Sequence, residues 1–512
     1  MHIRDHAASQ KPAVILHPSN TVVTFSELEA RANQLAHYFR RIGLVPGDTV
    51  AVIMENNAHL HVVMWAARRA GLYYATINTH LTVAEVAYVI ENSEAKAIIG
   101  SSVTKDVCLQ LVNQSAHLPA AALLIADDDL PGWRRYPDCV SDESTAPIAD
   151  EVEGDLLQYS SGTTGKPKGI RRELSGARPQ DTSNPLTPLL TALEFSNDSV
   201  YLSPAPLYHT APSMWSMSAQ SLGATVVVME KFDAEQALDC IARHRVTHGQ
   251  FVPTMFVRML KLPEQLRTSF DLGSLQRVVH AAAPCPPEIK HQMIAWWGPI
   301  IDEFYSSSEG VGITYIRAQE WLQRPGSVGR SLLGVPHIVD ENGAELPPGE
   351  PGDIYFEGGM AFSYLNDEKK TAESGNQQGW KTVGDVGYLD EDGYLFLTDR
   401  RHHMIISGGV NIYPQEAENL LVTHPSVMDA AVFGIADPGM GQVVKAVVQT
   451  VDPADTTERF ADELLDWLRA RMAHYKCPRS ISFEAELPRT DTGKLYKNEL
   501  IKKYSKPPAT AR

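Results

Sequence analysis

The run Ser160-Ser161-Gly162-Thr163-Thr164-Gly165-Lys166-Pro167-Lys168-Gly169 is the most informative stretch of this sequence. Its three glycines permit backbone conformations that other residues avoid, and four hydroxyl groups and two lysine ammonium groups stand beside them. A flexible loop so rich in N–H, O–H and NH3+ donors suits a polyphosphate. The Gly-x-x-x-x-Gly-Lys-[Ser/Thr] order of the Walker A loop is absent, and an ordinary solvated loop does not need the closing Pro-Lys-Gly. The run therefore predicts a phosphate-binding loop of another class.

Short apolar runs alternate with helical patterns on both sides of this loop. Thr24 and Glu27 have the spacing of a capping box and precede one of the helical patterns. The apolar runs that we interpret as buried strands cover residues 49–54, 97–100, 121–126, 199–203, 224–229, 277–280 and 300–305. This alternation predicts an α/β fold with largely parallel sheets.

The pattern changes after about residue 330. Turn signals such as Asn342-Gly343 and Asp392-Gly393 flank short strands and predict a β-rich subdomain. A smaller α/β unit follows residue 399. Its expected elements are a helix from about residue 415, strands near 430–433 and 443–450, and a helix over about 459–472.

The composition limits the classes of function. The 512 residues carry 62 acidic and 45 basic side chains, and the net charge of −17 argues against sequence-independent nucleic-acid binding. The five cysteines lie far apart without CxxC or metal-ligand spacing, so we expect neither a disulfide framework nor a zinc site. No apolar signal segment opens the chain, and no stretch approaches the ~20 apolar residues of a membrane span. We expect a soluble, cytoplasmic monomer or homodimer without an integral membrane part.

Six further motifs follow the loop in the chain. They cover residues 206–210, 281–284, 305–309, 384–385, 399–414 and 488–494. With these motifs in this order, the sequence resembles the adenylate-forming superfamily of acyl- and aryl-CoA synthetases, peptide-synthetase adenylation domains and firefly luciferase. The resemblance covers nearly the whole chain. It implies an N-terminal adenylation domain over 1–398, built from two α/β subdomains plus the β-rich subdomain, then a hinge over 399–406 and a small, mobile C-terminal α/β domain over 407–512.

The resemblance also implies ATP, Mg2+ and coenzyme A as the small molecules that the chain uses. It assigns Lys494 as the lysine that stabilises the charge developing in adenylation, and Glu309 with Thr164 as ligands of Mg2+. His209 is implied as a gate beside the acyl carboxylate. The residues implied to bind ATP or AMP are Ser160, Ser161, Gly162, Thr163, Thr164, Gly165, Lys168, Ala282, Ala283, Pro284, Tyr305, Ser308, Asp385 and Arg400.

The second half-reaction is implied by the hinge motif. Gly408 and Gly409 resemble the glycines beside the pantetheine channel, which favours transfer of the acyl group to coenzyme A. The sequence departs from the family at His402, the implied hinge residue, where Asp or Lys is common. It departs again at Ser306, where the family usually has glycine.

The identity of the acid is less determined. The residues implied to line the acyl pocket are His209, Val252, Phe256, Ala281 and Val311. Their apolar surroundings favour a hydrophobic acid. We rank a medium- or long-chain fatty acid or a bulky cyclic, steroid-type acid first, and an aryl or cinnamate-type acid second. Transfer to a free carrier protein, and a catalytically inert nucleotide-binding scaffold, are the alternative hypotheses.

Overall fold

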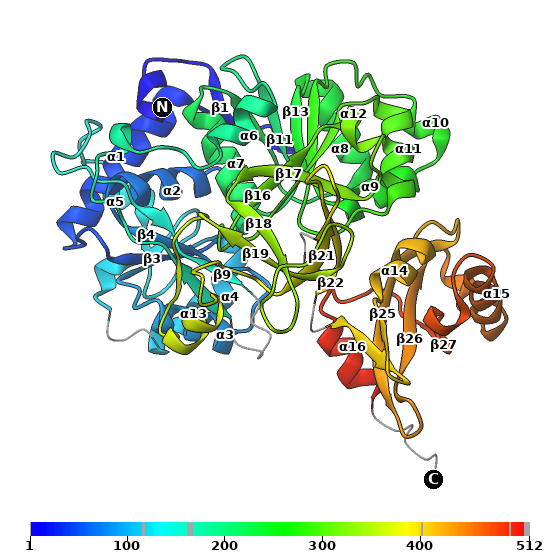
Figure 1. Ribbon diagram of the computed structural model, residues 1–512. Coiled ribbons are helices and arrows are strands. Elements are labelled where there is room, and N and C mark those ends of the chain that lie inside the picture. Colours follow the sequence, from blue (N-terminus) through cyan, green and yellow to red (C-terminus); the bar gives the residue numbers. More distant parts are fainter. Residues whose placement is uncertain (1, 115–117, 161–166, 401–402, 491–492, 506–512) are drawn as a thin grey trace, which may run out of the picture.

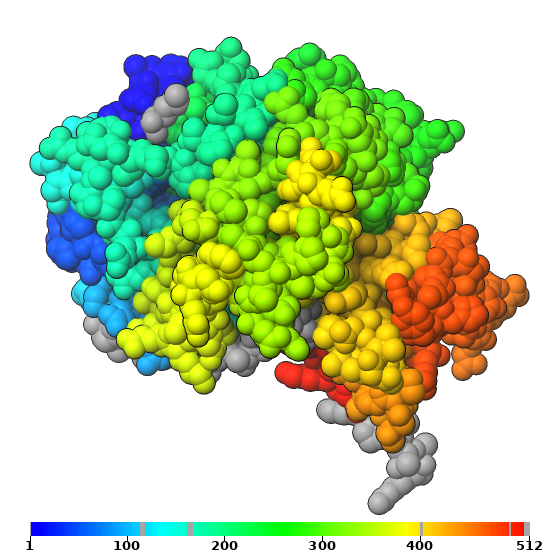
Figure 2. Space-filling model, viewed as in Figure 1, coloured from blue at the N-terminus to red at the C-terminus, as the bar shows by residue number. Residues whose placement is uncertain are grey.

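The computed structural model describes residues 2–114, 118–160, 167–400, 403–490 and 493–505. Two large sheets with helices on their faces form the main body, and a smaller sheet with its own helices forms a lobe at the C-terminal end (Figure 1). The lobe, orange and red in Figure 2, is seated against the green and yellow part of the body. This arrangement confirms the expected α/β fold with a large N-terminal and a small C-terminal part.

The first large sheet has six strands, and every neighbouring pair in it is parallel. Its strands in spatial order are β7 (Arg134–Arg135), β6 (Leu123–Ile125), β5 (Ala97–Gly100), β3 (Thr49–Ile53), β4 (Tyr73–Thr76) and β8 (Asp155–Leu156). The helices of this region are α1 (Phe25–Arg41), α2 (Leu60–Arg69), α3 (Val83–Asn92), α4 (Lys105–Gln114) and α5 (Tyr136–Val140). Helix α1 begins as predicted, because Thr24 and Glu27 form the reciprocal hydrogen bonds of a capping box.

The second large sheet has thirteen strands. Its α/β part contains β1 (Pro12–His17), β2 (Val22–Thr24), β11 (Val200–Ser203), β12 (Thr225–Met229), β13 (His248–Phe251), β14 (Arg277–His280) and β15 (Ile301–Ser306). The helices that accompany these strands are α6 (Thr187–Ala192), α7 (Thr210–Ser221), α8 (Ala234–His244), α9 (Pro253–Leu260), α10 (Glu264–Arg267) and α11 (Pro287–Trp297). Two buried clusters lie against this part, one with α7 and α1 and the other with α8, α9 and α11.

The predicted β-rich region is an antiparallel extension of the same sheet rather than a detached unit. Its strands are β16 (Ile313–Ile316), β17 (Ser327–Leu333), β22 (Leu395–Arg400), β21 (Asp385–Leu389), β19 (Gly352–Glu357) and β18 (Val335–Val339). The short helices α12 (Ala318–Trp321) and α13 (Glu368–Glu373) belong to this region. A separate three-stranded sheet contains β9 (Gln158–Ser160), β10 (Lys168–Arg171) and β20 (Ser363–Tyr364). It connects the phosphate-loop motif to the β-rich region.

The C-terminal lobe has its own sheet and its own hydrophobic core. The strands are β23 (Ile405–Ser407), β24 (Val410–Ile412), β25 (Val427–Asp437), β26 (Gly441–Thr450) and β27 (Ser480–Phe483). The helices are α14 (Gln415–Leu421), α15 (Glu458–Arg469) and α16 (Lys497–Tyr504). The helices and strands expected after residue 415 therefore lie where the sequence places them.

Contacts with the main body position the lobe. The Lys261 ammonium, just beyond α9, donates to the backbone oxygens of His424 and Pro425 at 2.9 and 3.1 Å. Among the described residues, no helix is both long and apolar enough to cross a membrane.

Candidate active site

The predicted phosphate loop connects two antiparallel strands. Strands β9 and β10 pair so that Ser160 lies opposite Lys168. Both ends of the loop are therefore held together by a sheet. The predicted ligands Ser161, Gly162, Thr163, Thr164 and Gly165 lie outside the described residues.

Two lysines flank an aromatic ring at the end of this loop. The ammonium groups of Lys168 and Lys370 lie 6.0 and 5.9 Å from the centre of the Tyr364 ring. The Tyr364 hydroxyl donates to a carboxylate oxygen of Glu309 at 2.9 Å. Burial, together with the positive charge of Lys370, lowers the pKa of Lys168 to about 8. The result is a cluster of two ammonium groups and one carboxylate, which is the chemistry that a polyphosphate with a divalent cation requires.

A hydrogen bond between Thr210 and Ser308 joins the Glu309 segment to helix α7. The two hydroxyl oxygens are 2.9 Å apart. His209 precedes Thr210 as the N-cap residue of α7, and its ring centre lies 4.7 Å from that of Tyr208. The structure therefore brings together the motifs at residues 206–210 and 305–309.

Tyr305 and Asp385 meet across the β-rich part of the sheet. The Tyr305 hydroxyl donates to Asp385 Oδ2 at 2.7 Å, and Asp385 is 8% exposed. Gly384, before it, has a φ of 84°, a left-handed conformation that favours glycine. In the β21–β22 ladder the backbone of Asp385 lies opposite Arg400. The two predicted ribose contacts are thus register partners.

The segment 281–284 follows strand β14 and carries backbone strain. Ala282 has a φ of 75°, which costs a residue with a Cβ about 1–2 kcal/mol. Non-glycine residues are kept in such conformations mostly at functional sites, where the surrounding structure enforces them. The small side chains of Ala282 and Ala283 leave the backbone open to close approach by a flat ligand.

A buried ionic group lies on the elements that flank this segment, β14, α11 and β15. Lys290 Nζ donates to Glu303 Oε2 at 2.8 Å, and His280 Nε2 lies 3.3 Å from the same oxygen. All three residues are buried. Burial alone raises the pKa of Glu303, but the neighbouring His280 and Lys290 outweigh it and hold the pKa at about 2. Burial also lowers the pKa of His280, although the Glu303 carboxylate opposes this shift. The group joins Lys290 of α11 to strands β14 and β15.

The five residues predicted to line the acyl pocket lie in different places. Ala281 belongs to the cluster beside α7, and Val311 to the core of the β-rich region. Val252 is the N-cap residue of α9. Phe256 is fully buried, and its ring packs against Phe251, His280 and Trp297. The structure therefore gives Phe256 a place in the core packing of α9 and α11.

The Lys494 loop is a tight turn that reaches the main body. Thr490 N donates to Lys494 O at 2.8 Å, and Lys494 N donates to Thr490 Oγ1 at 3.0 Å. Gly493 has a φ of 78° and packs so closely on α9 that a Cβ there would lie 2.7 Å from Thr254 Oγ1. The loop that carries Lys494 is therefore docked on the first turn of α9.

An arginine braces this loop from inside the lobe. Arg489 donates to both carboxylate oxygens of Asp429, at 2.5 and 2.7 Å. A third donation, at 2.5 Å, reaches the backbone oxygen of Gly493. Bidentate arginine–carboxylate pairs fix orientation as well as charge. Arg489 thus ties the residue next to Lys494 to strand β25.

The two glycines of the hinge motif have backbone conformations that favour glycine. Gly408 and Gly409 connect β23 to β24 as a two-residue turn, and their φ angles of 59° and 81° suit the turn that such hairpins favour. His403 lies 3.6 Å from the buried carboxylate of Asp399. The predicted hinge residue His402 lies outside the described residues.

Four residues of this site were missed by sequence reasoning: Tyr364, Lys370, Thr254 and Arg489. Arg489 stands in the motif at residues 488–494, but its partner Asp429 is 60 residues away. Tyr364 and Lys370 lie in a stretch with no motif of their own. Only pairing of β20 with β10 brings Tyr364 opposite Ile170.

Comparison with known proteins gives consistent matches over both parts of the chain. The model of the AMP-binding enzyme family matches residues 3–364, and that of the AMP-binding enzyme C-terminal domain matches residues 416–494. A feruloyl-CoA synthase from Amycolatopsis is 32% identical over 497 residues, covering 96% of each chain. A long-chain-fatty-acid–CoA ligase, FadD13, from Mycobacterium tuberculosis is 27% identical and covers 95% of this chain and 94% of its own.

A solved structure supports the fold. ATP-bound MatB from Rhodopseudomonas palustris superposes with a TM-score of 0.82 at 27% identity, over 97% of this chain and 96% of that one.

Proposed function

The chain belongs to the AMP-binding enzyme family and is an AMP-forming acyl-CoA ligase, and we propose that its acid is a compact hydrophobic one, aryl or arylpropenoic rather than long-chain. ATP and coenzyme A are substrates of such ligases, and Mg2+ is the usual ion. In the first half-reaction a carboxylate oxygen of the acid attacks the α-phosphorus of ATP, and the bond to pyrophosphate breaks. In the second, the sulfur of coenzyme A attacks the acyl carbon, the thiol loses its proton and AMP leaves.

The nucleotide lies, in this proposal, between the strained segment at Ala282 and the Tyr305–Asp385 pair. Asp385 accepts hydrogen bonds from the ribose hydroxyls, which a carboxylate suits. Lys168, Lys370 and the loop from Ser160 face the phosphates. Arg400, in register with Asp385, is the second ribose contact.

The donor set near the phosphates fits Mg2+. Glu309 is a partly buried carboxylate beside two lysines, and Mg2+ prefers one or two carboxylates together with phosphate oxygens. Glu309 would hold the ion, with Thr164 as the second proposed ligand. Bound there, Mg2+ would neutralise phosphate charge. Lys168 and Lys370 hold and orient the same phosphates.

The lobe supplies Lys494 to the α-phosphate. The docking of Gly493 on Thr254 supports this role, because it places the loop at the start of α9, next to Val252. We assign residues 1–398 to the adenylation domain, 399–406 to the hinge and 407–512 to the C-terminal domain. The separate core of the lobe supports a rotation about this hinge, which would bring Gly408 and Gly409 to the pantetheine arm.

One packing arrangement carries the preference for a compact acid. Trp215 is 1% exposed and lies on α7, the helix that begins after His209, and its ring centre is 5.8 Å from that of Phe304 of β15. Phe195 and Tyr201 pack on its other sides at 5.9 and 6.4 Å. A long chain entering between α7 and the sheet would have to displace this ring. The feruloyl-CoA synthase relative supports the same order of preference, which reverses the ranking suggested by the sequence.

A panel of acids tests this proposal. We expect pyrophosphate release to be fastest with ferulate or cinnamate, slower with a medium-chain acid and slowest with palmitate or a steroid acid, and product formation to require coenzyme A. Trp215→Leu should raise the rate of pyrophosphate release with the longer acids relative to the rate with cinnamate. Trp296→Leu, on α11, should leave the ranking of the acids unchanged. A preference of the native enzyme for palmitate would contradict the compact pocket. Turnover with a carrier protein but none with coenzyme A would contradict the assignment of coenzyme A as the acyl acceptor.

The Arg489 brace gives a prediction of its own. Arg489→Met removes the hydrogen bonds to Asp429 and Gly493, and hydrogen bonds to charged groups contribute roughly 1.5–3 kcal/mol. We expect adenylate formation to slow about 10- to 100-fold, with little change in thioester formation from supplied acyl-adenylate. Single-turnover assays of the two half-reactions measure this difference. Arg479→Met, at a more exposed ion pair with Asp437, is the control, and equal losses in both half-reactions would contradict a positioning role.

A further inference from the structure

Three metal-ligating side chains meet far from the site described above. His17 is the last residue of β1, and Cys240 and His244 lie on α8. One potential ligand atom from each residue lies within 4.8 Å of the others. His17 is 2% exposed, Cys240 is fully buried and His244 is half-buried.

The fold explains why these residues meet. Strand β1 runs parallel to β12, with His17 opposite Met229, and α8 follows β12 after a short connection. Asp233 caps α8 by accepting from Gln236 N. Cys240 and His244 are four residues apart, so they lie one turn apart on the same face of the helix. That face packs toward the end of β1, where the ring centres of His17 and His244 are 5.7 Å apart.

One nitrogen of each imidazole ring has no hydrogen-bond partner within the described part of the protein. His17 Nδ1 and His244 Nε2 are both buried without a hydrogen bond there. A buried polar atom without a partner costs free energy, and each such atom calls for an explanation, an ion among them.

We propose that His17, Cys240 and His244 form a site for a single Zn2+ ion. Two imidazoles and one thiolate are borderline-to-soft donors, which suit Zn2+ and not Mg2+. Tetrahedral Zn2+ at ~2.0–2.3 Å from each ligand brings the ligand atoms about 3.4 Å apart. The ligand atoms, which lie within 4.8 Å of one another, therefore close in by up to about 1.4 Å on binding, and the thiol proton of Cys240 is released to solvent.

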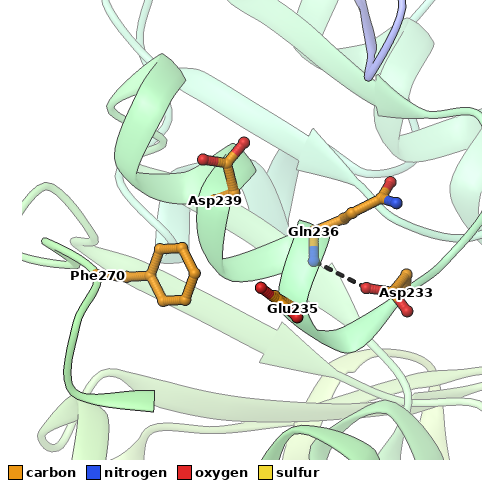
Figure 3. Close-up of a pocket in the computed structure, with 5 residues that line it drawn as sticks. All are labelled: Asp233, Glu235, Gln236, Asp239 and Phe270. Atoms are coloured by element: carbon orange, nitrogen blue, oxygen red, sulfur yellow. Dashed lines mark hydrogen bonds between the residues drawn. The ribbon is translucent and has the colours of Figure 1, made fainter. Parts of the chain in front are cut away.

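Asp239, which is paired with Arg243 at 3.2 Å, lies between this group and solvent. Its Oδ2 lies 3.9 Å from His17 Nε2. Its carboxylate also faces an open cavity of about 520 Å³ that Asp233, Glu235, Gln236 and Phe270 line with it (Figure 3). A cation from solvent would first meet these carboxylates and then the buried donors. The bound ion would fasten β1 to α8 and stabilise the fold, with no part in the reaction.

Metal binding to the full-length protein tests this site. After treatment with EDTA and dialysis, we expect one Zn2+ or one Co2+ per chain, and a Co2+ absorption spectrum with a thiolate charge-transfer band. Zn2+ should raise the melting temperature by a few degrees, and Mg2+ should not. Cys240→Ala and His244→Ala should each abolish the band and the shift. Cys108→Ala, at a buried cysteine beside Thr104, should retain both.

The outcome is decisive in either direction. Absence of stoichiometric binding by the native protein, or an unchanged Co2+ spectrum in Cys240→Ala, would overturn the proposal. If Cys240→Ala does not fold, the half-buried position of His244 makes His244→Ala the deciding variant, and retention of the Co2+ band there would overturn it equally. Pyrophosphate release with Mg2+ should be the same with and without Zn2+.

Discussion

Replacing Lys494 with alanine is expected to slow acid-dependent pyrophosphate release about 10²- to 10³-fold, the usual cost of losing one charge-stabilising group in a transition state. The expected loss follows from the position of the loop that carries Lys494. The Thr490–Lys494 turn, the Arg489 brace and the contact of Gly493 with Thr254 bring the loop to the start of α9 before any substrate binds. A preorganised ammonium stabilises charge as it develops between acid, phosphate and departing pyrophosphate.

The two half-reactions separate this role from a structural one. Lys494→Ala should form thioester from supplied acyl-adenylate at nearly the native rate, because the role proposed for the lysine is confined to adenylation. Lys502→Ala, at an exposed position on α16, is the matched control and should behave as the native enzyme. Undiminished exchange of pyrophosphate into ATP by Lys494→Ala would refute the assignment.

The largest effect on stability is expected at Glu303. Glu303→Ala leaves the buried Lys290 ammonium without its carboxylate, and breaking such a pair costs about 3–5 kcal/mol. The double variant Lys290→Met/Glu303→Leu removes both charges. Its free energy of unfolding should fall much less, because paired buried charges can often be replaced by apolar residues. Urea unfolding of the two variants and of the native protein measures the difference. Similar losses in the single and double variants would show that packing, not charge, dominates there.

The Lys290–Glu303 pair makes the stability of the protein fall as the pH is lowered. The pKa of Glu303 in the folded protein, about 2, is below its ordinary value of 4.5. The ion pair therefore contributes its full stability above the ordinary value, and this contribution is lost as the pH falls from about 4.5 toward 2. The double variant should lack this part of the acid-dependent loss, which urea unfolding at several pH values between 5 and 3 would measure.

Most of the fold could be predicted because it depends on local patterns. The apolar runs at 49–54, 97–100 and 277–280 are strands, and Thr24 begins a helix, since alternation of strand and helix patterns and capping chemistry act over a few residues. The continuity of the second sheet could not be predicted. Whether β17 pairs with β22, some 60 residues further on, depends on non-local hydrogen bonds that leave no periodic mark.

Some residues of the candidate site could likewise be predicted from the sequence, and others could not. Its motif residues, such as Tyr305, Ser308 and Asp385, could be named from their order in the chain, and the structure pairs Tyr305 with Asp385 directly. Tyr364 could not be found, because a single tyrosine between Ser363 and Leu365 has no signature. The sequence gives no local sign of the group of His17, Cys240 and His244, because one ligand lies more than 200 residues before the others.

The crowding of Lys168 and Lys370 around Tyr364 has a consequence for nucleotide binding. With a pKa of about 8, Lys168 exists as a mixture of ammonium and amine in mildly alkaline solution. Phosphate groups arriving beside it favour the ammonium form, so binding takes up a fraction of a proton from the buffer. For the proposed phosphate contact of Lys168, we expect the affinity for ATP to weaken as the pH rises above 8, even though ATP itself carries no more charge there.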